Sequence, residues 1–253
     1  MLSWVLKGLK TGIVSTNYPD RKETAPGVSP GLPAGKKEAG EAAGTLVDRC
    51  LTGALHLRDA EVQVDATRCV HCFRCIRGTQ SALDWQDGYE WAAGAREEGW
   101  KPGNEFGRSL HIRVVDAGAC GACLSEIEQL NKPCYNMHRL GFFLTPTPRE
   151  ADVLLVAGPV TDHMRTALRR AYEAMPTPKG VIAVGACALS GGVFGPSFAS
   201  GAGVQDVIPV DIVIPGCPPP PLAILHGLLL MVSRKESLAV ASLKSQSGGR
   251  RRG

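Results

Sequence analysis

The chain has 253 residues, 44% of them hydrophobic, which allows one or two globular domains. Its formal net charge is +4, and residues 234–253 alone contribute +5, from six Lys or Arg against one Glu. The rest of the chain is therefore close to neutral, and we expect no nucleic-acid partner. Nine cysteines are too few for a disulfide scaffold, and their close spacing suggests metal binding. No apolar stretch reaches the roughly 18 residues of a membrane span, and no signal-peptide pattern is seen, so we expect the reducing cytoplasm.

Residues 1–44 are expected to contain an amphipathic helix and a linker. Over residues 2–14, apolar side chains at helical spacing share one face and two lysines lie off it: Leu2, Val5, Leu6, Leu9 and Ile13 against Lys7 and Lys10. Such a helix can pack on its own protein, or lie on a membrane or a membrane subunit. Residues 19–44 are rich in Pro, Gly, Lys and Glu, which predicts a linker or a long surface arm.

The first cysteine constellation is the run Cys69-Val-His-Cys72-Phe-Arg-Cys75. Bacterial ferredoxin runs with this spacing come in pairs, and the fourth cysteine of each run ligates the other cluster. Here Thr79 replaces the fourth cysteine, and of a preceding run only its fourth cysteine, Cys50, survives. The cross-ligation rule therefore predicts one complete ligand set for a 4Fe–4S cluster: Cys50, Cys69, Cys72 and Cys75.

Residues 45–80 are predicted to form a small α+β ferredoxin-like half-module. Between its cysteines, residues 54–65 alternate apolar and polar side chains around Asp59-Ala60, which predicts a β-hairpin. Residues 81–107 are interpreted as a connector, and they hold the tryptophans Trp85, Trp91 and Trp100. The basic residues 234–253 are predicted to be a disordered tail.

Residues 108–233 show a repeated strand–loop–helix pattern. Short β-branched strands are predicted at 111–116, 152–157, 181–184 and 207–214, with helices at 124–131, 162–175 and 219–233. Buried strands that alternate with helices favour a parallel sheet covered on both faces. The fold class predicted for this part is an α/β domain with a flavodoxin-like parallel sheet.

The second cysteine constellation follows the predicted strands of this α/β part. Cys120 and Cys123 come after the first strand, Cys187 after the 181–184 strand and Cys217 after the last one. Ligands of open α/β sheets bind at the carboxyl ends of the strands. Flanking glycines allow a bulky group to approach the backbone closely. These four cysteines are the predicted ligands of a second 4Fe–4S cluster.

Alternatives exist for each set. Cys120 and Cys123 could instead form a thioredoxin-like redox pair at a helix N-terminus, although this leaves two cysteines unexplained. Zinc is an alternative metal at either set, and the three-cysteine run favours iron–sulfur for the first. Cys134 is interpreted as a buried or idle thiol, and His71 and His138 as surface or packing residues rather than ligands.

Four motifs of the α/β part carry a resemblance to a known family: Asp116-Ala-Gly-Ala-Cys-Gly-Ala-Cys123 with Glu126, Ala151-Asp-Val-Leu-Leu-Val-Ala-Gly-Pro-Val-Thr161, Val184-Gly-Ala-Cys-Ala-Leu-Ser-Gly-Gly192 and Ile214-Pro-Gly-Cys-Pro-Pro-Pro-Pro221. In order and spacing they resemble the small-subunit family shared by membrane-bound, energy-converting nickel–iron hydrogenases and respiratory complex I. Residues 1–80 separately resemble the ferredoxin-like subunit of these assemblies, so the chain looks like a fusion of two neighbouring subunits.

The resemblance implies that the second set holds the proximal cluster, which faces the active site of a hydrogenase-like large subunit. Complex I subunits typically have adjacent cysteines at the first site, whereas Cys120 and Cys123 are separated here, as in the hydrogenase branch. Glu126 matches an acidic position of that branch and is a candidate proton relay, although a glutamate near a helix N-terminus is also favoured by the dipole. Further expected partners are membrane subunits and a soluble electron donor or ferredoxin.

The expected function is that of an iron–sulfur electron-transfer subunit with two 4Fe–4S clusters, peripheral on the cytoplasmic side of the cell membrane. It would relay electrons between a soluble donor and a partner's active site and would not be catalytic alone. The alternatives are an NADH–quinone oxidoreductase subunit proper, a thiol–disulfide oxidoreductase that uses Cys120 and Cys123, and a non-redox assembly subunit with vestigial sites.

Overall fold

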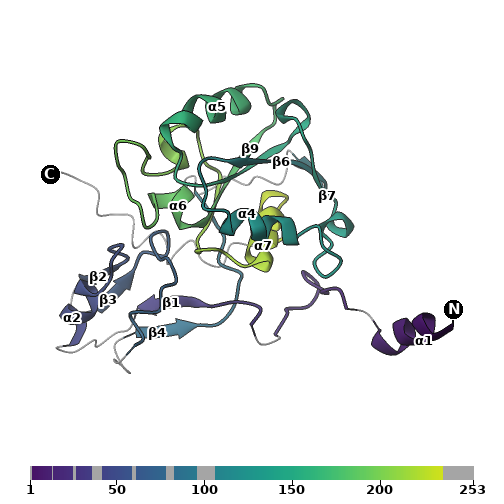
Figure 1. The fold of residues 1–253 in the computed structure, drawn as a ribbon, viewed down its shortest axis with the longest axis horizontal. Helices are drawn as coiled ribbons and strands as arrows, with labels where there is room; N and C mark the ends of the chain where they lie inside the picture. Colours follow the sequence, from purple (N-terminus) through teal and green to yellow (C-terminus); the bar gives the residue numbers. More distant parts are fainter. Residues whose placement is uncertain are drawn as a thin grey trace.

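The computed structural model describes residues 2–12, 14–24, 27–35, 42–58, 61–77, 83–95 and 106–235. Its largest element is a six-stranded sheet with the order β5-β10-β9-β8-β6-β7, drawn in the upper part of Figure 1. The bounds are β5 Ala93–Gly94, β6 Leu110–Asp116, β7 Phe142–Leu144, β8 Val153–Ala157, β9 Gly180–Val184 and β10 Ile212–Ile214.

Five of these strands are parallel, and only β5 is antiparallel, against β10. Numbered along the chain from β6, the parallel strands stand in the order 2-1-3-4-5. This is the flavodoxin-like order, so the predicted α/β class is confirmed for this part of the chain. The order reverses between β6 and β8, and the loops after both strands therefore open at one edge.

Helices cover both faces of the sheet because its strands are apolar on both sides. Along β8, Leu155 contributes to a core shared with α4 (Ala122–Gln129) and α7 (Pro221–Met231), whereas Leu154 contributes to the opposite core. That opposite core includes side chains of α5 (Asp162–Glu173) and α6 (Gly185–Ser190). Every residue of α7 is buried, as expected of a helix that is apolar all round.

The N-terminal half is built from smaller pieces. The predicted hairpin is present as β2 (Leu55–Arg58) and β3 (Glu61–Val64), which pair antiparallel, with its turn at 59–60 outside the described residues. Together with α2 (Ala42–Asp48) it encloses a separate core of Leu46, Leu55, Val62 and Val64. The ferredoxin-like character of residues 45–80 stays a prediction.

Three strands occur where the sequence analysis expects a linker and a connector. β1 (Leu32–Gly35) pairs antiparallel with β4 (Leu83–Gln86), and the connector then adds β5 to the edge of the large sheet. The connector is anchored further by the Ala92 N–H, which donates to His226 Nδ1 of α7 at 3.2 Å. These pairings over four residues or fewer have no periodicity that a sequence pattern can detect. Residues 78–82 and 96–105 lie outside the described part.

Residues 18–22 and Lys235, near the two ends of the described chain, meet at one carboxylate. Glu90, whose side chain is 8% exposed, receives Lys22 Nζ at 2.6 Å, Lys235 Nζ at 3.0 Å and the Tyr18 hydroxyl at 3.2 Å. The helix α1 (Leu2–Thr11) projects away from this contact and stands apart from the body in Figure 1. Of the predicted tail, only residues 234 and 235 are described, and 236–253 lie outside.

Some predicted elements differ in extent. The strand expected at 207–214 covers only Ile212–Ile214, because Val204–Asp206 forms a short 3-10 helix and Pro209 lacks the N–H that a strand needs. β7 and α6 were not predicted. They are three and six residues long, too short for a clear hydrophobic period.

Candidate functional site

The first cysteine set lies in the N-terminal half. Cys50 follows α2, whereas Cys69, Cys72 and Cys75 lie on the loop after β3. All four line one pocket together with the aromatic side chain of Trp85 on β4 and other apolar groups. The structure therefore brings together the four residues that the cross-ligation rule selects.

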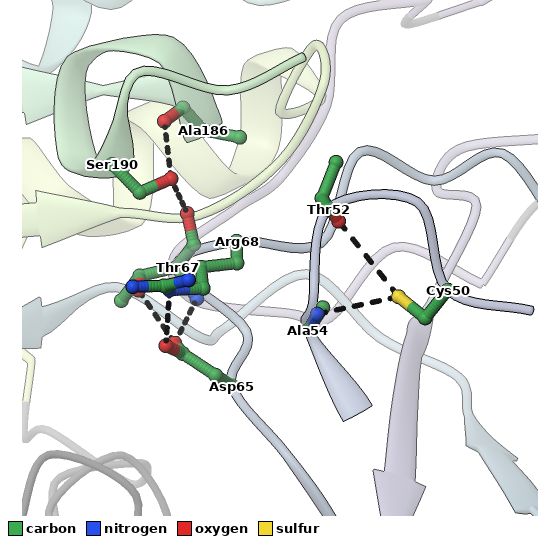
Figure 2. A network of polar contacts seen from close by, with 8 residues as sticks. All are labelled: Cys50, Thr52, Ala54, Asp65, Thr67, Arg68, Ala186 and Ser190. Atoms are coloured by element: carbon green, nitrogen blue, oxygen red, sulfur yellow. Dashed lines mark hydrogen bonds and ion pairs between the residues drawn. The ribbon is translucent and has the colours of Figure 1, made fainter. Parts of the chain in front are cut away.

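Backbone N–H groups converge on the sulfurs of this set. The Ala54 N–H donates to Cys50 Sγ at 3.2 Å, and the Thr52 hydroxyl lies 3.8 Å from the same sulfur (Figure 2). The backbone N–H of His71 bonds to Cys69 and that of Ile76 to Cys75. Hydrogen bonds of this kind stabilise thiolates and tune the potentials of iron–sulfur groups bound to them.

Burial raises the pKa values of two of these thiols, Cys69 and Cys75. It raises the pKa of Cys69 to about 12, against a smaller lowering by the His71 N–H, and the neighbouring sulfurs of Cys75, Cys50 and Cys72 raise it further. Four thiolates in one largely apolar pocket therefore require a cationic group among them. This donor chemistry fits a bound metal centre.

Aromatic rings surround the loop of the first set. His71, between two of its cysteines, is buried with its ring centroid 6.2 Å from that of Trp85 and 6.3 Å from that of Trp91. Burial lowers the pKa of His71 to about 4, so the ring is neutral near pH 7. Of the surface and packing positions expected for His71, the structure shows a buried one. His138 is exposed and stacks on Phe143.

The second cysteine set lies at the edge of the large sheet. Cys120 and Cys123 stand in the turn after β6 and the first turn of α4, Cys187 lies in α6 directly after β9, and Cys217 follows β10. All four positions follow carboxyl ends of parallel strands, as predicted. Cys123 is buried, Cys187 and Cys217 are partly buried and Cys120 is exposed. Cys134 is exposed elsewhere, and its carbonyl accepts the Thr16 N–H at 2.8 Å.

Two glycines make room for the sulfurs of this set. A Cβ added to Gly185 would lie 2.6 Å from Cys123 Sγ, and one added to Gly192 would lie 2.6 Å from Cys187 Sγ. Both glycines have positive φ, which other residues adopt only with strain. The Val193 N–H also bonds to Cys187. Glycine flanks were visible in the sequence, but the sulfur that each one accommodates was not.

Burial also raises the pKa values of three thiols of the second set, Cys123, Cys187 and Cys217. The pKa of Cys123 reaches about 12, and the sulfurs of Cys217, Cys187 and Cys120 add to the effect, which shows that the four lie within electrostatic reach of one another. Glu126, on α4, is partly buried, and burial raises its pKa as well. Across the described ranges, no three His, Cys, Asp or Glu side chains converge closely enough to hold a metal ion as they stand.

A polar contact joins the two cysteine sets. The Ser190 hydroxyl, at the end of α6, donates to the carbonyl oxygens of Thr67 and Ala186, each at 3.0 Å (Figure 2). Asp65 holds this turn, because its carboxylate accepts the Thr67 N–H at 3.0 Å and pairs with Arg68 Nε at 3.4 Å. Thr67 precedes Cys69 by two residues, so the contact fixes the loop of the first set against α6.

Comparison with known proteins identifies the α/β part. Residues 120–231 match the model of the family "NADH ubiquinone oxidoreductase, 20 Kd subunit". The "Probable membrane-bound hydrogenase subunit mbhJ" of Pyrococcus furiosus is 41% identical over 143 residues, which are 56% of this chain and 86% of that protein. The chain belongs to this 20 Kd subunit family and is therefore a subunit of an oxidoreductase complex.

Two further proteins are similar. An NADH-quinone oxidoreductase subunit of Heliobacterium modesticaldum is 42% identical over 123 residues, which cover 48% of this chain and 70% of that one. A chain of the structure of the membrane-bound sulfane sulfur reductase, an archaeal respiratory membrane complex, is 32% identical, with a TM-score of 0.45 over 51% of this chain and 73% of that chain. Within the described residues, no helix is long and apolar enough to cross a membrane.

Proposed function

We propose that the chain is the electron-transfer subunit of a membrane-associated, hydrogenase-like or complex I-like oxidoreductase, and that each cysteine set holds one 4Fe–4S cluster. The observation that carries the proposal is the grouping of the cysteines in two sets of four, the first around one pocket and the second at one edge of the large sheet, each with a backbone N–H bonded to at least one sulfur. The first set is Cys50, Cys69, Cys72 and Cys75, and the second is Cys120, Cys123, Cys187 and Cys217.

The pKa directions favour a metal cluster over thiol–disulfide chemistry at the second set. A reactive C-x2-C pair at a helix N-terminus works with a lowered thiol pKa. Burial instead raises the pKa of Cys123 to about 12, and the pair shares its space with two further cysteines. A cluster supplies the positive charge that thiolates need at such a site and, when bound, takes up and releases one electron.

The exposure of the cysteines suggests a direction for the relay. In the first set Cys72 is the exposed member, so a soluble donor such as a ferredoxin would approach there. In the second set Cys120 is exposed, and the loop beyond Cys187 presents Val193, Phe194 and Phe198 to solvent, the last with 96% of its surface exposed. An apolar patch beside the second set fits the docking of a large subunit that carries the active site.

Helix α1 supports a peripheral position on the cytoplasmic side of a membrane. Four of its apolar side chains are exposed, among them Leu9 at 78% and Leu6 at 58%, and its charged residues are the lysines Lys7 and Lys10. A helix of this kind lies on an anionic lipid surface with its apolar face inserted. Full-length chain should sediment with anionic vesicles, and Leu9→Glu should release it, whereas Leu57→Glu, an equally apolar exposed site on β2, should not.

Glu126 is proposed to exchange protons beside the second set. Its pKa is raised by burial, and it lies one helical turn after Cys123. A carboxyl group with a raised pKa can take up and release protons closer to neutral pH than an exposed one. Glu126→Gln should slow turnover of the assembled complex without changing the iron content of the chain.

The proposed function is tested by iron and sulfide analysis with low-temperature EPR of the anaerobically purified, reduced chain. Two clusters predict about eight irons per chain and two interacting reduced signals. Cys187→Ser should lower the content to about four irons and leave the signal of the first set. About four irons in the wild-type chain, with Cys120 and Cys123 open to alkylation, would sink the two-cluster proposal.

A further inference from the structure

A buried aromatic contact joins the two cysteine sets, in addition to the polar contact at Ser190. On the first side is the His71 ring, whose neighbours in sequence include the ligand Cys72. On the other is Trp91 of the connector, 6% exposed, whose ring packs edge-on against His71 with centroids 6.3 Å apart. The Trp91 indole N–H donates to the Pro215 carbonyl at 2.8 Å, and Pro215 precedes Cys217 by two residues.

The burial and the backbone conformation of His71 are energetically unfavourable for a residue whose only role is packing. His71 is 8% exposed, and neither ring nitrogen has a hydrogen-bond partner among the described residues. Its backbone adopts φ of 50°, which is strained for a residue other than glycine. A buried polar group without partners calls for an explanation beyond packing. Its position between a cysteine ligand and the indole of Trp91 provides one.

We infer that His71 and Trp91 form the electronic contact between the two sets and hold them at a fixed separation. This inference rests on the proposed function. The step is the transfer of one electron, in which one set's cluster is oxidised and the other's is reduced, and no bond forms or breaks. The route runs from Cys72 to the His71 ring, across to Trp91, and through its N–H···O bond to Pro215 and Cys217.

The Ser190 contact is an alternative route between the two cysteine sets, and it passes through more backbone residues. It leaves the first set two residues before Cys69 and joins the second three residues after Cys187. The aromatic route adjoins Cys72 directly and reaches Cys217 within two residues, through two rings in edge-on contact and one hydrogen bond. Two variants therefore separate the routes: one removes the Trp91 ring and the other removes the Ser190 hydroxyl.

The test uses the iron-loaded full chain in rapid freeze-quench EPR after a pulse of photoreductant. Cys72→Ser and Cys187→Ser supply the reference spectra of the separate clusters, so the rate of transfer between sets can be followed. We expect Trp91→Leu to slow this rate about tenfold, as outer-shell changes commonly do. Trp91→Phe, which keeps a ring but loses the N–H donor, should lie between Trp91→Leu and wild type.

Trp4→Leu, which changes an exposed side chain of α1 far from both cysteine sets in the sequence, is the tryptophan control. It should leave the transfer rate at the wild-type value. A wild-type rate in Trp91→Leu and Trp91→Phe with all eight irons present would overturn the inference, as would slowing by Ser190→Ala alone. About four irons in the wild-type chain would instead contradict the proposed function itself, before any variant is compared.

Discussion

The two halves of the molecule present their cysteines on very different supports. The first set depends on two short strands, a seven-residue helix and a core of four buried residues: Leu46, Leu55, Val62 and Val64. The second set rests on the edge of a six-stranded sheet with a large core on each face. A small core supplies only a few kcal/mol of stability, so we expect the first half to need its bound group in order to fold and the second half to fold without one.

The largest difference between the two halves is expected when iron is removed from the chain. Chelation should abolish hydrogen-exchange protection of the β2–β3 amides, because the four cysteines of the first set then lose the group that joins them. Protection at β8 and β9 should remain. Cys72→Ser should reproduce the loss at β2–β3, whereas Cys187→Ser should not. Unchanged protection of β2–β3 in the iron-free chain would show that the small core is sufficient alone.

A glycine substitution sharpens the comparison at the second set. Gly192→Ala places a Cβ where Cys187 Sγ lies, 2.6 Å away, whereas Gly195→Ala has the same left-handed strain with nothing within 4 Å. Each substitution costs about 1–2 kcal/mol for the backbone conformation. Only Gly192→Ala should also displace a ligand, and iron should then fall from about eight toward four per chain with the first EPR signal intact. Equal iron contents in the two variants would contradict the ligand role of Cys187.

The sequence predicted the regular half of the fold better than the irregular half. Strands such as β8 and β9 are apolar throughout, and the ends of these strands locate the second cysteine set without reference to a structure. The β1–β4 pair could not be predicted, because its strands are four residues long and its paired residues are 48 to 54 positions apart. The contacts of Trp91 were equally hidden, since its partners, His71 and Pro215, are distant in the sequence.

The smallest predicted effect concerns Glu90, where residues 18–22 meet Lys235. Burial alone would raise the pKa of Glu90, but hydrogen bonds from Lys22 and Lys235 outweigh it and lower the pKa to about 2 from an ordinary 4.5. A carboxylate with a lowered pKa stabilises the folded chain above pH 4.5, and this stability is lost as the pH falls toward 2.

Glu90→Gln should therefore destabilise the chain by about 1–3 kcal/mol at pH 7, as expected for lost hydrogen bonds to a charged group. The difference from wild type should shrink between pH 5 and pH 2.5. Urea unfolding of both proteins in the same iron-free state checks this, because acid loss of iron then affects neither. Glu173→Gln, at an exposed position of α5, should show no such difference. If Glu90→Gln destabilised the chain equally at pH 5 and at pH 2.5, the charge of Glu90 would not be the cause. Packing and hydrogen-bond geometry alone would then hold residues 18–22 in place.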